Sequence, residues 1–161
     1  MNQKEIIHVE NFTQQYGDFK AVDSISFDVF EGEIFGFVGP NGAGKSTTIN
    51  TLCTILRKTK GKIIINGHNV DTQQDLVRKD IGVVFQDSTL DRTMTIEETL
   101  KLHCEFYQIP KNEIDERIDF VLELVDLKDK KKNVVAGLSG GMKRRIEIAR
   151  GILHYPKILF F

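Results

Sequence analysis

The sequence predicts an α/β fold that carries a helical subdomain, and its layout supports this prediction in three ways. Short β-rich segments fill the first third of the 161 residues, and a glycine-rich loop leads from the last of them into a helix. Two segments with helical character follow between residues 95 and 127. The chain then returns to an apolar strand at residues 158–161, as expected for an α/β domain with a helical insert.

The bulk composition fits one soluble globular domain. Hydrophobic residues make up 40% of the chain and charged residues 28%, and the net charge of −1 gives no basic field that favours nucleic acid. No apolar run approaches the ~20 residues of a membrane-spanning helix, and residues 1–10 lack the apolar core of a signal peptide. Cys53 and Cys104 have no metal or redox spacing. The histidines also lack ligand spacing and are expected at the surface or in packing: His8, His68, His103 and His154.

The first half of the chain is predicted to be mostly strand. Residues 5–12 are short and β-rich, residues 21–30 alternate apolar and polar side chains, and residues 33–39 (EIFGFVG) are typical of a buried strand. A helix is expected over about residues 45–56. The strand KIIING closes on Asn66-Gly67, the commonest hairpin signal, and a helix-sized stretch then leads to a buried strand at residues 81–86.

The second half is predicted to be mostly helical. A Thr95-x-x-Glu98 capping box begins one helix, which ends before Pro110. The apolar side chains of the next helix fall on one stripe: Ile114, Ile118, Val121, Leu122 and Val125. The charged segment KDKKKN is interpreted as a solvated connection rather than a binding patch. A further helix, over about residues 139–154, precedes the closing strand.

The glycine-rich loop carries the strongest functional signal. GPNGAGKST matches the phosphate-loop pattern G-x-x-x-x-G-K-[ST] in full, with a predicted strand before it and a helix after it. Gly42 and Gly44 allow successive N–H groups to turn inward as an anion nest, at the positive end of the helix dipole. Lys45 supplies a charge for the β- and γ-phosphates, and Ser46 offers a hydroxyl to Mg²⁺. The predicted nucleoside triphosphate site comprises Gly39, Pro40, Asn41, Gly42, Ala43, Gly44, Lys45, Ser46 and Thr47.

These groups must act together to hold a nucleotide. One helix terminus contributes at most ~2 kcal/mol to anion binding. A dissociation constant between ~1 mM and ~1 μM requires about 4 to 8 kcal/mol. The nest, the lysine and the metal are therefore all expected to contribute.

A second glycine motif, LSGGM at residues 138–142, opens the helix before the closing strand. Ser139 is a suitable N-cap, and Gly140 and Gly141 expose backbone N–H groups without a side chain in the way. Three cations follow in the first turns, where positive charge opposes the helix dipole: Lys143, Arg144 and Arg145. Either an approaching phosphate or a salt-bridged surface accounts for them.

Taken together, GPNGAGKSTT and LSGGM resemble the motifs of the ATP-binding cassette (ABC) ATPase family over about residues 5–161. Met142 stands where the family more often has glutamine. The resemblance implies a P-loop NTPase (RecA-like) core with an N-terminal antiparallel β subdomain and an inserted helical subdomain. It implies one partial nucleotide-binding domain, with the β subdomain and core over about 1–86, the helical subdomain over 87–137 and the signature helix and last strand over 138–161.

The resemblance also implies roles for single residues. Tyr16 stands where the family places an aromatic ring on adenine, although by itself it would be a packing tyrosine. Gln86 stands at the family's Q-loop glutamine, which approaches Mg²⁺ and the attacking water. Lys45 and Gln86 are thus the expected catalytic residues, and Ser46 and Gln86 the expected metal ligands. Residues Ser139, Gly140, Gly141 and Met142 would close over ATP held by the phosphate loop of a second subunit.

Function and partners follow from the same resemblance. It implies an ATP-binding subunit that couples MgATP binding and hydrolysis to export, most similar to drug, polysaccharide or lipid exporters. The expected partners are transmembrane permease subunits and a second ABC ATPase in a head-to-tail dimer, with no nucleic acid. The subunit would lie in the cytoplasm, on the inner face of the membrane. The alternatives are a soluble, ribosome-associated ABC ATPase and an ATP-binding module without its own turnover.

The last strand, KILFF, bears on hydrolysis. In the family this strand leads directly into an aspartate that positions Mg²⁺ and a glutamate that polarises the attacking water. Neither follows Phe161 in this sequence, so we expect a truncated domain that binds ATP but hydrolyses it poorly. An unpaired edge at residues 158–161 would also favour pairing with another chain.

Overall fold

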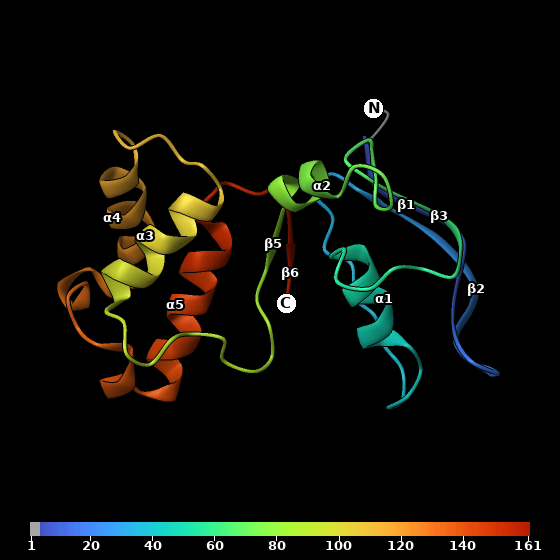
Figure 1. The fold of residues 1–161 in the computed structure, drawn as a ribbon, viewed down its shortest axis with the longest axis horizontal. Coiled ribbons are helices and arrows are strands. Elements are labelled where there is room, and N and C mark those ends of the chain that lie inside the picture. The colour runs from blue at the N-terminus through green and yellow to red at the C-terminus, as the bar shows by residue number, and fades with distance from the viewer. Residues whose placement is uncertain (1–3) are drawn as a thin grey trace. The chain divides into compact units, whose positions relative to one another are not determined.

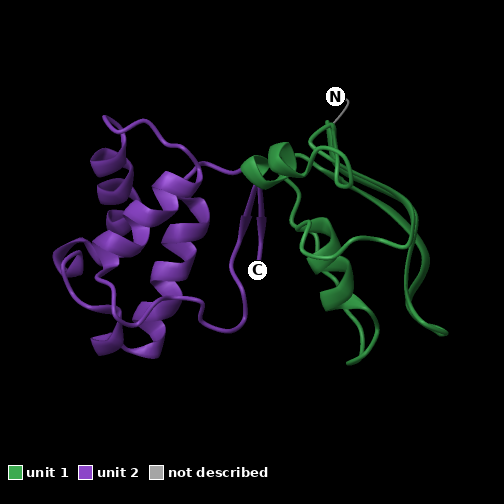
Figure 2. Cartoon of the chain, viewed as in Figure 1, with its two compact units in different colours: residues 1–80 green, residues 81–161 purple. Residues whose placement is uncertain are grey.

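The computed structural model describes residues 4–161, so the first three residues of the predicted domain lie outside the described part. The chain forms two compact units, residues 1–80 and residues 81–161, which we call the N-terminal and C-terminal units (Figure 2). Figure 1 shows the strands β1, β2 and β3 running side by side in the first unit, and the helices α3, α4 and α5 gathered in the second. Among the described residues, no helix has the length and apolarity needed to cross a membrane.

An antiparallel sheet organises the N-terminal unit. Its strands are β1 (Glu5–Tyr16), β2 (Phe19–Phe30), β3 (Lys60–Ile65) and β4 (His68–Asn69), in the order β2-β1-β3-β4. Between β3 and β4, Asn66 (φ 46°) and Gly67 (φ 82°) both adopt the left-handed conformation that a tight hairpin turn needs. The strands predicted at residues 5–12 and 21–30, the strand KIIING and this hairpin are confirmed. The sheet buries side chains of β1 and β3, with Phe12, Ile63 and Ile65 completely enclosed.

The helices of this unit are shorter than the sequence pattern indicates. Helix α1 (Lys45–Leu52) ends four residues before the predicted end at residue 56. Thr54 turns left-handed at φ 60°, and the N–H groups of Ile55 and Leu56 both donate to the carbonyl of Asn50. The Thr54 hydroxyl also accepts a hydrogen bond of 2.9 Å from Arg78 of α2 (Gln74–Asp80), which helps to hold this unusual turn.

The predicted buried strand at residues 33–39 is wrong. This segment forms no strand, and Ile34 and Val38 are each 99% exposed. Its rings Phe35 and Phe37 instead pack on Phe27 of β2, with ring centroids 5.2 and 5.4 Å apart. An apolar run indicates that a segment is suited to burial, but a strand also needs a hydrogen-bonding neighbour. Within the described part of the N-terminal unit, no strand pairs with this segment.

The C-terminal unit combines a short parallel strand pair with a helical core. Strand β5 (Ile81–Val83) pairs in parallel with β6 (Ile158–Phe160), and both are shorter than predicted. Residues of β6 are half-buried rather than fully enclosed. The helices are α3 (Ile96–Phe106), α4 (Ile114–Leu124) and α5 (Gly140–Ile152), with short 3₁₀ turns η1 (Lys128–Lys130) and η2 (Val135–Gly137). One apolar cluster joins the three helices, including Leu100, Ile118 and Ile146.

Local signals in this unit behave as the sequence predicts. Thr95 and Glu98 form both halves of the capping box at the start of α3. Ile118, Val121 and Leu122 of the predicted α4 stripe are buried, and Ile114 and Val125 pack against the same core. Two lysines of KDKKKN pair with carboxylates of α4: Lys128 with Glu123 at 3.3 Å and Lys131 with Asp119 at 2.7 Å. These contacts support the interpretation of this segment as a solvated connection.

Two histidines of this unit pack against a tyrosine ring. His154 stacks on Tyr107 with ring centroids 3.7 Å apart, and His103 lies 4.7 Å from the same ring. His154 also makes a 2.9 Å hydrogen bond to the carbonyl oxygen of Ile81. Burial, with smaller contributions from the nearby His154 and Arg150, lowers the pKa of His103 to about 3. Burial likewise lowers the pKa of His154. The expectation that these are packing histidines is confirmed.

This stack predicts an acid-sensitive C-terminal unit. His103 is neutral when folded, while in the unfolded chain it takes up a proton near its ordinary pKa of about 6.5. The stability that depends on neutral His103 is therefore complete above that pH and is lost as the pH falls from about 6.5 towards 3. We expect the free energy of unfolding, measured in urea, to fall between pH 7 and pH 5. A His103→Gln variant should lose less stability over the same range, and an equal loss would contradict the assignment.

Candidate nucleotide-binding site

The phosphate loop has the backbone conformation that an anion nest requires. Gly42 (φ 85°) and Gly44 (φ 83°) are both left-handed, and α1 begins directly after them at Lys45. Gly44 is the N-cap of α1, and no side chain caps this helix end. The first N–H groups of a helix have no partner within the helix. This end of α1 is therefore suited to binding an anion through its backbone and its dipole.

The side chain of Lys45 folds back over the loop that precedes it. Its ammonium Nζ donates to the carbonyl oxygens of Gly39 at 2.7 Å and Pro40 at 2.6 Å. These contacts hold a positive charge next to the backbone of the predicted nest. Carbonyl oxygens are weaker partners for an ammonium group than ionised phosphate oxygens. The lysine is thus placed where an anionic ligand could compete with the loop for it.

Gly44 lies too close to β2 to carry a side chain. A Cβ atom at this position would lie 2.4 Å from the Ala21 carbonyl oxygen and 2.8 Å from a methyl group of Val22, both in β2. Real Cβ atoms do not approach backbone oxygen this closely. Only glycine therefore satisfies both the left-handed turn and the contact with the sheet.

The other predicted ligands of the N-terminal unit lie mostly at its surface. Asn41, Ala43 and Ser46 are exposed, and Thr47 is half-buried in the first turn of α1. Tyr16 ends β1 opposite Phe19 and is 48% exposed, so its ring is not part of the core. An exposed aromatic ring is open to stacking with a base.

Gln86 and the LSGGM motif belong to the C-terminal unit. Gln86 is exposed and follows the end of β5, rather than ending the strand as predicted. Ser139 caps α5, as predicted, by accepting a hydrogen bond of 3.2 Å from the Met142 N–H. Gly140 and Gly141 are exposed, and a Cβ added to either would meet no atom within 4 Å. Their backbone is thus accessible, while Met142 packs against the helical core.

Two of the three cations after this motif are held within the unit. Arg144 contacts the Phe85 carbonyl oxygen and lies 3.6 Å from a carboxylate oxygen of Glu147. Arg145 donates to the Val125 carbonyl oxygen at 3.0 Å. For these arginines the structure favours the alternative of internal pairing over that of an approaching phosphate.

Sequence reasoning gave no structural role to Glu147. This carboxylate is 3% exposed, although glutamate on an amphipathic helix ordinarily indicates a solvent-facing position. The sequence feature that could have indicated a structural role for Glu147 is its spacing of three residues from both Arg144 and Arg150. That spacing is equally typical of exposed ion pairs.

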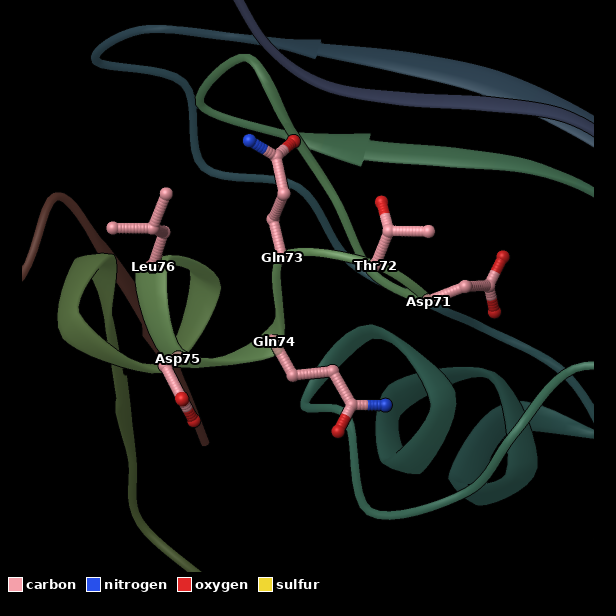
Figure 3. A pocket seen from close by; sticks show the side chains of 6 residues that line it. All are labelled: Asp71, Thr72, Gln73, Gln74, Asp75 and Leu76. Carbon is pink, nitrogen blue, oxygen red and sulfur yellow. The ribbon is translucent and has the colours of Figure 1, made fainter.

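A surface hollow at residues 71–76 and a cluster of charged side chains on the sheet do not form a second candidate site. A surface hollow of about 410 Å³ is lined by one consecutive segment around the start of α2, residues 71–76 (Figure 3). Its Asp71 is paired with Lys58 at 2.7 Å, and its Asp75 lies 3.4 Å from Arg78. On the sheet, the exposed Glu5 and Asp28 lie beside His8, and the 2.7 Å contact between His8 and Asp28 already pairs them.

The fold and the glycine-rich loop define the class of protein. They are those of a P-loop NTPase domain with an N-terminal antiparallel sheet, and solved structures support this class. The chain aligns with cbiO1 from Clostridium perfringens, described as part of the ABC transporter complex cbiONQ, at a TM-score of 0.85 and 28% identity. The alignment covers 98% of this chain and 64% of that one.

Residues 22–161 match the family model described as ABC transporter, and the chain belongs to this family. Its relatives include the methionine import ATP-binding protein MetN 1 of Listeria monocytogenes, which is 39% identical over 87% of this chain and 43% of that protein. The linearmycin resistance ATP-binding protein LnrL of Bacillus subtilis is 36% identical over 96% of this chain and 50% of its own length. The chain thus spans about half the length of the curated relatives it matches.

The close contact at residue 44 gives a test of the loop that needs no ligand. A Gly44→Ala substitution combines a left-handed residue, which costs about 1 to 2 kcal/mol, with a Cβ only 2.4 Å from the Ala21 carbonyl oxygen. We expect the free energy of unfolding of the N-terminal unit to fall by about 2 kcal/mol or more. Urea unfolding followed through backbone amide signals of β1 and β3 measures this change.

Gly39→Ala is the matched control for this test. Its Cβ would lie 3.5 Å from that of Ala43, an ordinary contact, so we expect a change within about 0.5 kcal/mol. Equal stability of the two variants would show that Gly44 does not support the loop against the sheet.

Proposed function

We propose that this chain binds MgATP through the phosphate loop and is the ATP-binding part of an ABC transporter subunit. The left-handed pair Gly42 and Gly44 before the uncapped start of α1 carries this proposal. Lys45 adds a charge that is already held over the same loop. Backbone donors, helix dipole and ammonium group are the components that recognise a triphosphate.

The side-chain chemistry of three of the proposed site residues suits a bound Mg²⁺ ion and an adenine ring. Mg²⁺ prefers oxygen ligands, and Ser46 places an exposed hydroxyl in the first turn of α1. Gln86, exposed after β5, offers an amide oxygen that can serve as a ligand or orient water. Tyr16 supplies an exposed ring for the base. When bound, the metal would neutralise phosphate charge, and these residues would hold and orient the nucleotide.

The signature residues are proposed to act on the nucleotide of a second subunit. Ser139 fixes the start of α5, and the exposed Gly140 and Gly141 leave backbone N–H groups accessible there. A head-to-tail dimer would bring these donors to ATP held by the partner's phosphate loop. A transmembrane permease is the further partner, contacting the helices between Gln86 and the signature. This contact would place the subunit on the cytoplasmic face of the membrane.

We propose export as the direction of transport, because the motifs GPNGAGKSTT and LSGGM-x-R-R resemble those of exporter subunits. The resistance protein LnrL is a relative consistent with this direction. The methionine import protein MetN 1 is similarly close, at 39% identity, so import is the second candidate. Uptake and efflux assays of membrane vesicles that contain the subunit together with its permease would separate the two directions.

Nucleotide binding itself is tested by Lys45→Ala. Removing one hydrogen-bonding charge from a phosphate site costs about 1.5 to 3 kcal/mol, so we expect MgATP to bind about 10- to 100-fold more weakly. Calorimetric titration of the chain with MgATP measures the change.

Lys62→Ala is the control, because Lys62 is an exposed lysine on β3 of the same unit. It should bind MgATP as the unchanged chain does. Equal affinity of the Lys45→Ala variant and the unchanged chain would overturn the proposed site.

A further inference from the structure

Glu147 of α5 is a buried carboxylate to which the proposed function gives no role. Its side chain is 3% exposed, and it lies next to the apolar core residue Ile146. An ionised carboxylate that leaves water is strongly unfavourable unless hydrogen-bond donors replace its hydration. The donors that Glu147 has recruited therefore indicate what the residue holds in place.

One carboxylate oxygen of Glu147 contacts the segment that contains Gln86, and the other lies near an arginine that contacts the same segment. Oε1 accepts a hydrogen bond of 3.0 Å from the backbone N–H of Thr89. Oε2 lies 3.6 Å from Nη1 of Arg144, and the same nitrogen donates to the carbonyl oxygen of Phe85. One carboxylate is thus connected to both ends of residues 85–89, which we call the Gln86 loop.

A third side chain of α5 reaches the same loop. Nη2 of Arg150 donates to the Thr89 hydroxyl at 2.5 Å. Arg144, Glu147 and Arg150 are spaced by three residues, so they lie along one face of the helix. Among the described residues, the side chains that hydrogen-bond to the Gln86 loop all come from α5. The loop has no regular secondary structure of its own and is exposed throughout.

We infer that Glu147 is a positioning residue that, with Arg144 and Arg150, fixes the Gln86 loop to the signature helix. Because α5 begins at the Ser139 cap, the anchored Gln86 and the signature glycines would move as one body. A change at either position would then be transmitted to the other through α5. The inference rests on the proposed function in so far as Gln86 acts on Mg²⁺ and water.

The contacts of Glu147 with Thr89 and Arg144, which we call the anchor, require a carboxylate rather than an amide. A carboxylate only accepts hydrogen bonds, so its two oxygens can face the Thr89 N–H and the Arg144 guanidinium at once. A glutamine has the same shape, but its NH₂ group must face one of these two donors. Glu147→Gln therefore breaks one side of the anchor with little change in volume.

Amide hydrogen exchange of the full chain tests the anchor without nucleotide. We expect exchange at Thr89 and its neighbours in residues 85–89 to become about tenfold faster or more in Glu147→Gln, since local opening sets this rate. Exchange in the helical core around Leu100 and Ile118 should be unchanged. Glu116→Gln, the same substitution at an exposed position of α4, is the control and should leave the Gln86 loop as it was.

A second variant covers the case in which Glu147→Gln unfolds the unit. Arg144→Gln removes the contact with the Phe85 carbonyl from a side chain that is 40% exposed, so folding is expected to tolerate it. It should also accelerate exchange across residues 85–89. Unchanged exchange at the Gln86 loop in the folded variants would overturn the inference.

The link to nucleotide is tested by the gain in ATP affinity that Mg²⁺ provides. Glu147→Gln should reduce this gain in affinity. A double variant with Glu147→Gln and Gln86→Ala should show the same gain as Gln86→Ala alone, because Glu147 acts through Gln86. Additive losses would contradict that route. Absence of ATP binding in the unchanged chain would contradict the proposed function, while the exchange comparison would still decide the anchor.

Discussion

The contact between Gly44 and the Ala21 carbonyl is the constraint on which the candidate site depends. The end of the phosphate loop lies so close to β2 that residue 44 has no space for a side chain. The left-handed turn at the same residue sets the direction in which α1 starts. Fixing the loop and helix before any ligand arrives reduces the ordering cost that binding would otherwise carry.

Lys45 illustrates how the loop is prepared for a ligand. Its ammonium group is satisfied by the Gly39 and Pro40 carbonyl oxygens, so the charge is not left unpaired without nucleotide. A phosphate would offer this group stronger, charge-assisted hydrogen bonds. In the C-terminal unit we propose a comparable structural task for Glu147, which accepts a hydrogen bond from a loop that has no regular secondary structure of its own.

Much of the fold and the composition of the phosphate loop could be predicted from local patterns. The Asn66-Gly67 turn, the Thr95 capping box and the Ser139 cap all depend on neighbouring residues alone, and the structure confirms each of them. The features that were not predicted correctly depend on contacts and conformations that local sequence patterns do not contain. EIFGFVG has the composition of a strand but lacks a pairing neighbour among the described strands of its unit. The early end of α1 depends on a left-handed threonine, a conformation that β-branched residues rarely adopt. Burial of Glu147 depends on donors from a loop 58 residues away in the chain.

The central claim is that the backbone of the phosphate loop binds the triphosphate of MgATP. Its most direct test is an NMR titration of the ¹⁵N-labelled chain with MgATP, followed through backbone amide signals. We expect the largest shifts at Gly42, Gly44, Lys45 and Ser46, with saturation between about 1 μM and 1 mM MgATP. Shifts concentrated elsewhere, for example at the hollow of residues 71–76, or no saturable shift at the loop, would contradict it.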